Sequence, residues 1–197
     1  MWPDYTTRQL DRAGFVDGRE IAQREWELAN LLNIYHQLQP QVVVELGVYQ
    51  GGTLHFWLQN APPNATIIGI DCLPIDEHWR TWVPSGITLD YLQGDTHDPV
   101  TLTGLQEILR GRPIDFLFID CDHTEEGVTR DFEMYGPLVR SGGVIAFHDI
   151  LDPDPERQQD NIRVSRLWER IQRAGYFTRE LVAHPEQDWG GIGVLVK

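Results

Sequence analysis

Short apolar runs alternate with amphipathic stretches through the middle of the chain. The apolar runs are nearly continuous, which is typical of strands buried on both faces of a parallel sheet. The predicted strands are Val42–Glu45, Thr66–Asp71, Ile87–Leu92, Ile114–Asp120 and Gly143–His148. The predicted helices between them are Leu54–Gln59, Val100–Leu109 after a cap at Asp98, and Thr124–Val139. This alternation indicates an α/β fold with helices on both faces of a mostly parallel sheet.

The N-terminal part of the chain carries a different pattern. Residues Arg19–Leu38 place apolar side chains at helical spacing up to Pro40, which predicts one long helix before the first strand. We therefore expect an N-terminal helical segment, residues 1–40, packed on or capping a core domain, residues 41–197. The apolar side of that helix suits either its own domain or a second copy of the chain, so a homo-oligomer stays open.

The C-terminal part predicts an antiparallel pair of strands. A helix is expected at Ile162–Ala174, followed by strands at Tyr176–Val182 and Gly191–Val196. The connection between these two strands is too short for a crossover helix, so they should pair antiparallel. The tract Asp152–Asp160 is rich in proline and charge, and we expect it to be a mobile loop.

Composition narrows the range of partners. The formal net charge of −14 argues against nucleic acid, because binding to phosphates needs clustered cations. Lys197 is the only lysine, which argues against Schiff-base chemistry and against a Walker-type phosphate loop. No apolar run reaches the ~18 residues of a membrane span and the start lacks a signal-peptide pattern, so we expect a cytoplasmic protein. Cys72 and Cys121 are expected to be free thiols.

A glycine turn follows the first predicted strand, in the stretch VVVELGVYQGG. The spacing places Glu45 at the strand end, Gly47 next to it and Gly51 before the following helix. A dinucleotide fingerprint would need a glycine two positions after Gly47, where Tyr49 stands. The turn therefore indicates a nucleotide-like ligand other than a nicotinamide dinucleotide.

Acidic residues end successive predicted strands, and residues 41–78 contain no lysine or arginine. Because the carboxyl ends of parallel strands share one edge of a sheet, these acids should surround one ligand. S-adenosylmethionine fits them, since it carries a sulfonium and an ammonium and no phosphate. Asp71 is expected to accept from the ribose hydroxyls and Asp95 to reach the adenine amino group. Glu45, Gly47, Tyr49, Gly51, Thr53 and Asp120 complete the expected cofactor shell.

Several motifs together resemble the class I S-adenosylmethionine-dependent methyltransferases. They are VVVELGVYQGGT, IIGIDC, LQGDTHD, FLFIDCDHTEEGVTRDFEMYGPLVRSGGVIAFHDI and GGIGVLV. The resemblance spans Val42 to Val196 and is strongest to the subgroup of cephalosporin hydroxylase-type proteins and metal-dependent sugar O-methyltransferases. It implies a Rossmann-like, seven-stranded, mostly parallel sheet with a C-terminal antiparallel hairpin. It also implies O-methylation of a small hydroxylated substrate, such as a sugar, a polyketide or another natural product.

A second group of polar residues ends the fourth and fifth predicted strands. If those strands are neighbours, Asp120 and Asp149 meet at one divalent cation, and carboxylates suit Mg²⁺. His148 would shift the preference towards Mn²⁺ or another transition metal, and many relatives carry an acid there. Such a cation would lower the pKa of a substrate hydroxyl. His123 is expected to be the general base, a role that the resemblance also implies at this spacing.

Other roles stay open. Asp120 also suits a contact with the methionine part of the donor, and His148 suits a half-buried histidine bonded to the backbone. Asp122 is expected to cap the next helix, with Glu125 completing a box-like arrangement. At the level of function, an NAD-dependent oxidoreductase and a non-catalytic S-adenosylmethionine-binding protein are the alternatives.

Overall fold

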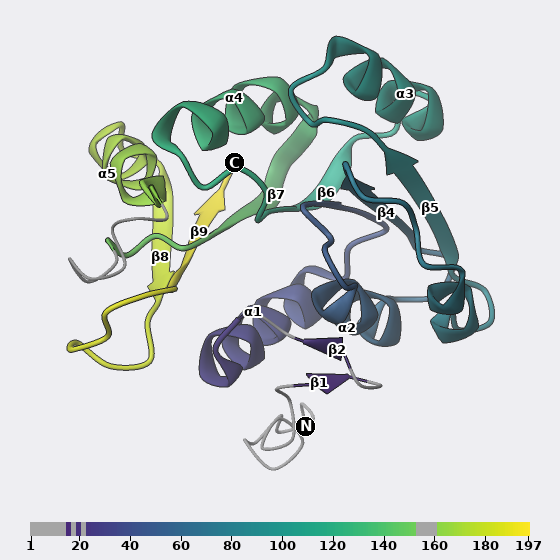
Figure 1. Ribbon diagram of the computed structural model, residues 1–197, viewed down its shortest axis with the longest axis horizontal. Helices are drawn as coiled ribbons and strands as arrows, with labels where there is room; N and C mark the ends of the chain where they lie inside the picture. Colours follow the sequence, from purple (N-terminus) through teal and green to yellow (C-terminus); the bar gives the residue numbers. More distant parts are fainter. Residues whose placement is uncertain (1–14, 17–18, 21–22, 153–160) are drawn as a thin grey trace.

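A twisted 7-stranded sheet forms the centre of the molecule in a computed structural model, which describes residues 15–16, 19–20, 23–152 and 161–197 (Figure 1). The strand order is β5-β4-β3-β6-β7-β9-β8. These strands are β3 (Val42–Leu46), β4 (Thr66–Asp71), β5 (Thr88–Gln93), β6 (Ile114–Ile119), β7 (Val139–His148), β8 (Phe177–Leu181) and β9 (Ile192–Val196). A separate 2-stranded sheet pairs β1 (Phe15–Val16) with β2 (Arg19–Glu20).

Helices cover both faces of the large sheet (Figure 1). One face carries α1 (Glu25–Leu38) and α2 (Gly52–Asn60), with η1 (Glu77–Trp82) beside α2. The other face carries α3 (Pro99–Leu109), α4 (Glu125–Tyr135) and α5 (Val164–Arg173), and η2 (Gly136–Leu138) continues α4. No helix in the described part of the chain combines the length and apolar character needed to cross a membrane.

The pairing of the strands confirms the predicted fold class. Strands β3, β4, β5, β6 and β7 all run parallel to one another, whereas β9 is antiparallel to both β7 and β8. The predicted C-terminal antiparallel pair is therefore correct. The strand order reverses between β3 and β6, and in such sheets ligands bind beyond the carboxyl ends of the strands at this point.

Two hydrophobic clusters form the core, one on each face of the sheet. Strand β3 contributes to both, because successive side chains point to opposite faces. Val43 joins the cluster under α1 and α2, and Val44 joins the cluster under α3, α4 and α5. Within the first cluster, Tyr35 of α1 stacks on Trp57 of α2 at a ring-centroid distance of 5.2 Å. Helix α1 is thus built into the core.

The structure corrects three local predictions. The first helix begins at Glu25 instead of Arg19, because Arg19–Glu20 pairs as a strand and Arg24 is extended at φ −69° and ψ 137°. The fourth predicted helix ends at Tyr135, and the strand predicted from Gly143 already begins at Val139. A register shift between Ile114 and Phe116 accompanies this early start. The glycines within β7 had suggested that the strand starts later.

The predicted cap at Asp122 is also wrong. Thr124 is the N-cap residue of α4, and its hydroxyl oxygen accepts from the Gly127 N–H at 3.0 Å. Asp122 instead accepts from the Thr124 N–H at 2.9 Å, one step before the helix. The predicted cap at Asp98 is confirmed, since its carboxylate accepts from the Val100 N–H. Of the tract predicted to be mobile, residues 153–160 lie outside the described residues, as do residues 1–14 of the N-terminal segment.

Candidate functional site

A cavity of about 520 Å³ lies at the carboxyl ends of the strands, beside the point where the strand order reverses. Eight of the residues predicted for the site line it: Gly47, Tyr49, Thr53, Asp71, Asp120, His123, His148 and Asp149. The other described lining residues are Gln23, Val48, Gln50, Gly52, Cys72, Leu73, Cys121, Ile162 and Trp189. The carboxyl ends of β3, β4, β6 and β7 therefore bring the predicted residues together around one cavity.

The glycine turn is shaped by close backbone contacts. Gly47 has φ +82°, and a Cβ atom there would lie 2.0 Å from the carbonyl oxygen of Asp120. Gly51 has φ +80°, and a Cβ atom there would lie 2.7 Å from the ring of Trp79. Only glycine fits both positions, because side chains clash there and positive φ is unfavourable for other residues. Gly51 therefore supports the turn from behind instead of lining the cavity.

Asp71 holds the turn against the end of β4. Its Oδ2 accepts from the N–H groups of Val48 and Tyr49, both at 2.8 Å, and its Oδ1 accepts from the Leu73 N–H at 2.8 Å. Carboxylates that accept several backbone N–H groups are rigidly oriented. Asp71 thus fixes the turn while its side chain still forms part of the cavity wall.

Besides Gly51, two predicted cofactor residues, Glu45 and Asp95, do not line the cavity. Glu45 is 1% exposed and faces the core, where burial, followed by the charges of Asp120 and Asp71, raises the pKa of its carboxyl well above the ordinary value. Burial thus favours the neutral form of this carboxyl, which lies beneath the cavity. Asp95 is exposed after β5 and accepts from the His97 N–H at 2.8 Å. Because both residues stand near strand ends, the sequence placed them at the edge of the sheet. It did not indicate how deeply each side chain is buried.

Four side chains converge at the ends of β6 and β7. Their ligand atoms all lie within 4.8 Å of one another. His123 Nε2 lies 3.0 Å from Asp120 Oδ1 and 3.3 Å from Asp149 Oδ2. His148 Nδ1 lies 3.2 Å and 3.4 Å from the same two oxygens. We call Asp120, His123, His148 and Asp149 the acid–histidine cluster.

The backbone conformation at Asp149 and the pairing of β6 with β7 bring these side chains together. Asp149 directly follows β7 with φ +59°, a conformation that is uncommon outside glycine and is concentrated at functional sites. Strands β6 and β7 are hydrogen-bonded neighbours, as predicted, so Asp120 and Asp149 end side by side. The side chain of His148 is 4% exposed and that of His123 is 34% exposed. His123 is thus the member of the cluster that a molecule in the cavity can reach most easily.

The cluster perturbs its own protonation. Burial alone would raise the pKa of Asp120, but His148 and His123 lower it to below its usual range. Burial alone would lower the pKa of His148, but Asp120 and Asp149 raise it well above the ordinary value, and the pKa of His123 is raised in the same way. In the absence of another cation, the imidazoles therefore compensate the two carboxylates.

The donor set fits a single divalent cation. Two carboxylate oxygens and two imidazole nitrogens at this spacing can share one ion, which would replace the compensating protons. Carboxylates alone favour Mg²⁺, whereas imidazole nitrogen favours Mn²⁺ and other first-row transition metals. Because cluster formation needs both strands and the loop that follows β6, the sequence could identify its members only through the expected strand order.

Gln23 is a site residue that sequence reasoning missed. It is 6% exposed and stands between the acid–histidine cluster and the glycine turn. Its Nε2 donates to Asp120 Oδ2 at 2.5 Å, and its Oε1 accepts from the Thr53 hydroxyl at 2.8 Å. The contact with Asp120 joins residues 97 positions apart, and no motif around Gln23 signals it.

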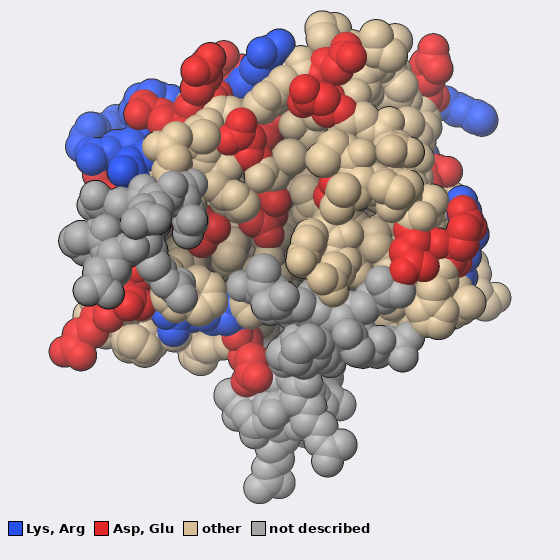
Figure 2. All heavy atoms as spheres, in the orientation of Figure 1, with Lys and Arg blue, Asp and Glu red and all other residues tan. Residues whose placement is uncertain are grey.

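Among the residues that the structure describes, protonated histidine is the only source of positive charge in the cavity wall. None of the described lining residues is lysine or arginine, whereas Asp71, Asp120 and Asp149 all contribute to the wall. On the face shown in Figure 2, acidic side chains are spread across the surface and basic ones gather mainly over α5. A neutral or cationic ligand therefore suits this cavity better than an anionic one.

Comparisons with known proteins agree with this geometry. A family model described as a methyltransferase domain matches residues 44–150. An uncharacterized protein, R132, of Acanthamoeba polyphaga mimivirus is 32% identical over 132 residues, which are 64% of this chain and 58% of that protein. The chain thus spans little more than half the length of this curated relative.

Solved structures share the fold. The O-methyltransferase TomG from Streptomyces achromogenes, involved in tomaymycin synthesis and solved with S-adenosylmethionine, matches with a TM-score of 0.63 and 13% identity. That match covers 99% of this chain and 90% of TomG. The methyltransferase MycE of mycinamycin biosynthesis, solved with Mg, S-adenosylhomocysteine and mycinamycin VI, matches with a TM-score of 0.65 and 19% identity, over 97% of this chain and 54% of MycE.

The family model covers more than half of the chain and includes the glycine turn, Asp71 and the whole acid–histidine cluster. This match confirms the resemblance that the sequence motifs indicated and leaves the alternative of an NAD-dependent oxidoreductase without support. By its motifs, its strand order and this match, the chain belongs to the family of class I methyltransferase domains.

Proposed function

We propose that the protein transfers the methyl group of S-adenosylmethionine to a hydroxyl oxygen of a small molecule, with the help of a divalent cation. The observation that carries this proposal is the position of the acid–histidine cluster in the same cavity as the glycine turn. One wall suits a methyl donor, and the other suits a hydroxyl group that must lose its proton.

The donor side of the cavity is acidic and is rich in backbone groups. Gly47 lets the turn pass close to the Asp120 backbone. Asp71 lines the cavity, and a ribose hydroxyl would replace the weak contact that the Cys72 thiol makes with its Oδ1. The absence of basic side chains from the described wall favours a sulfonium over a pyrophosphate. TomG and MycE, which have the same fold, were solved with S-adenosylmethionine and its demethylated product, respectively.

On the acceptor side, Asp120, His148 and Asp149 would hold the cation, and His123 would remain the base. A bound cation would polarise the acceptor hydroxyl and lower its pKa. His123 Nε2 would then take the hydroxyl proton while the oxygen bonds to the methyl carbon and the carbon–sulfur bond breaks, releasing S-adenosylhomocysteine. The greater exposure of His123 supports this division of roles. MycE, solved with Mg, supports a metal in this fold.

The chemistry of the cavity also limits the acceptor. A cation held by two carboxylates binds neutral oxygen donors well, and two adjacent hydroxyls would bind it together. Phosphorylated or carboxylated acceptors would meet the acidic wall without a compensating side chain among the described residues. We therefore propose an uncharged or cationic polyhydroxyl acceptor, such as a sugar, a catechol or a hydroxylated polyketide.

Calorimetry with S-adenosylmethionine, S-adenosylhomocysteine and NAD tests the donor side. We expect heat from the first two ligands only, and uptake of NAD alone would overturn the proposal. The acceptor side is tested by screening sugars, catechols and polyketides for formation of S-adenosylhomocysteine with added Mg²⁺ or Mn²⁺. Binding of the donor without turnover of any acceptor, and without uptake of either cation, would favour the non-catalytic alternative.

Two substitutions separate the residue roles. Asp120→Asn should abolish binding of Mn²⁺ together with turnover, because it removes a charged ligand. His123→Ala should lower turnover by about 10²–10⁴-fold and leave Mn²⁺ binding intact, which is the expected loss of a general base. If His123→Ala loses the cation as well, His123 is a ligand and the proposed base is wrong.

A further inference from the structure

Gln23 connects the two halves of the cavity. Its side-chain amide is buried between the Thr53 hydroxyl, in the first turn of α2, and the Asp120 carboxylate, at the end of β6. The amide oxygen accepts from Thr53, so the amide nitrogen is left to donate to Asp120. The two contacts together specify a single orientation of the amide.

The contact with Asp120 is made on the oxygen that faces away from the histidines. Gln23 Nε2 binds Oδ2, while Oδ1 lies 3.0 Å from His123 Nε2 and 3.2 Å from His148 Nδ1. A carboxylate held at one oxygen in this way cannot rotate freely about its χ2 torsion. The bond therefore presents Oδ1 to the centre of the acid–histidine cluster.

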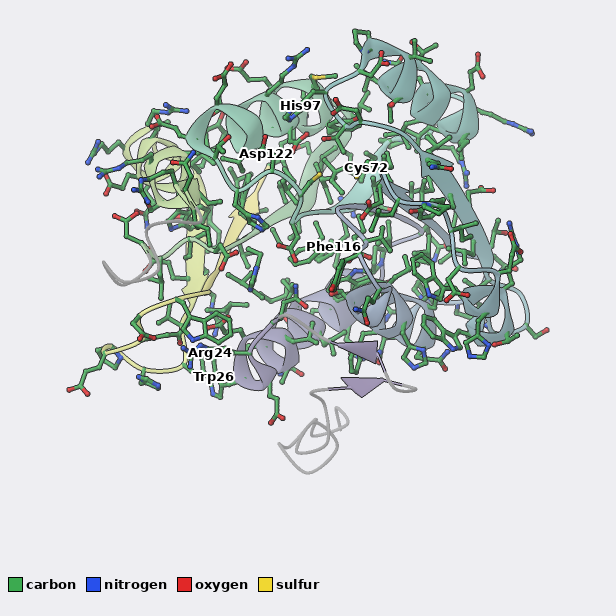
Figure 3. The ribbon with its side chains drawn as sticks, in the orientation of Figure 1. Arg24, Trp26, Cys72, His97, Phe116 and Asp122 are labelled. Atoms are coloured by element: carbon green, nitrogen blue, oxygen red, sulfur yellow. The ribbon has the colours of Figure 1, made fainter. Side chains whose placement is uncertain are left out.

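The chain next to Gln23 is held in place by contacts with the segment before β9. Glu27, four residues further along, is 0% exposed and accepts from the Gly191 N–H at 3.1 Å and from the Gln187 side chain. Arg24 lies over the ring of Trp189, 4.2 Å from its centroid, and pairs with Asp188 at 3.4 Å. In Figure 3, Arg24 lies at the start of α1 beside the β8–β9 loop. Gln23 is thus delivered to the cavity by an anchored segment.

We propose that Gln23 is a positioning residue for the cation site, which orients Asp120 through Oδ2 and joins it to the glycine turn through Thr53. The proposal rests on the cation that the proposed function includes. Partners that orient a metal ligand from outside the coordination sphere typically contribute 10–100-fold to metal affinity. The N-terminal segment then has a chemical role in addition to covering the sheet.

Gln23→Met tests the proposal, because methionine has nearly the same length and cannot donate to Asp120. We expect the dissociation constant for Mn²⁺, measured by electron paramagnetic resonance without donor or acceptor, to rise by about 10–100-fold. The variant should still unfold in one cooperative thermal transition above the temperature of the Mn²⁺ measurement, which separates positioning from a general loss of structure. Gln23→Leu removes both hydrogen-bonding groups without adding a charge, and it should also weaken Mn²⁺ binding.

Gln59→Met is the matched control, since the Gln59 amide donates to the Trp82 carbonyl at 2.7 Å and does not line the cavity. It should leave Mn²⁺ affinity unchanged. If Asp120→Asn abolishes Mn²⁺ binding but both Gln23 variants bind within threefold of the wild type, the role of Gln23 is refuted and the proposed function stands. If Asp120→Asn binds Mn²⁺ as the wild type does, the cation site itself is wrong.

Discussion

Asp131, on α4, is a buried acid whose charge should cost stability at neutral pH. The side chain is 0% exposed, and its Oδ1 lies 3.3 Å from Nε2 of His97, which Figure 3 places beside α4. Burial raises the pKa of Asp131 from 3.8 to about 6, against smaller opposing effects of Thr96 and His97. The folded protein therefore binds this proton more tightly than the unfolded chain does.

The sign and size of the effect follow from this difference. Because the folded pKa is the higher one, the stability contribution is fully present below pH 3.8 and is lost as the pH rises through about 6. At 1.36 kcal/mol per pH unit, the interval from 3.8 to about 6 means that the charge of Asp131 destabilises the folded protein by about 3 kcal/mol at pH 8. At pH 4.5 the same relation gives a destabilisation of only about 1 kcal/mol.

Asp131→Asn keeps the shape of the side chain and removes its charge. We expect the free energy of unfolding in urea, followed by tryptophan fluorescence, to increase by up to about 3 kcal/mol at pH 8 and by about 1 kcal/mol at pH 4.5. Glu133→Gln, at an exposed position of the same helix, is the control and should change it by less than about 0.5 kcal/mol at either pH. A destabilised Asp131→Asn protein at pH 8, or an equal gain at both pH values, would show that the charge of Asp131 does not destabilise the folded protein and that the reasoning is wrong.

Three further predictions concern the turn, the helix cap and the base. Gly47→Ala should lower the free energy of unfolding by more than about 2 kcal/mol, because a Cβ atom would lie 2.0 Å from the Asp120 carbonyl oxygen. Gly86→Ala, at φ +83° in open space, should cost only about 1 kcal/mol, and equal losses in thermal unfolding would contradict the steric argument. Thr124→Ala should cost about 1 kcal/mol in urea unfolding through loss of the α4 cap, and an unchanged midpoint would argue against that cap. Although burial lowers the pKa of His123, the neighbouring carboxylates raise it more in the cation-free protein, so protons should compete with the cation and Mn²⁺ affinity should increase as the pH rises above about 6.5; a Mn²⁺ affinity that does not change with pH would contradict this protonation.

The strands of the sheet were predictable because their signals are local. Apolar runs bounded by glycine, proline and acidic residues located β4 to the residue and β3, β5 and β6 to within one residue at either end. Boundaries decided by pairing with distant segments were less predictable. The early start of β7 at Val139 and the pairing of Arg19–Glu20 with β1 both depend on partners that periodicity does not identify.

The acid–histidine cluster could be predicted because all four members lie at or within a few residues of the carboxyl ends of β6 and β7. Once the motifs indicated the strand order, elementary sheet geometry brought them together. The depth of Glu45 and Asp95 could not be predicted in the same way. Both stand near strand ends, yet one is buried in the core and the other is exposed to solvent.

By itself, the sequence determined the class of fold, the glycine turn and the identity of the groups at the strand ends, since these depend on periodicity and on residues adjacent in the chain. Only the tertiary structure decided that Gln23 bonds to Asp120, that Glu27 is held by the segment before β9, and that Glu45 lies beneath the cavity. Such contacts join residues that are far apart in the chain. They form only when whole helices and strands pack together, so local sequence patterns do not predict them.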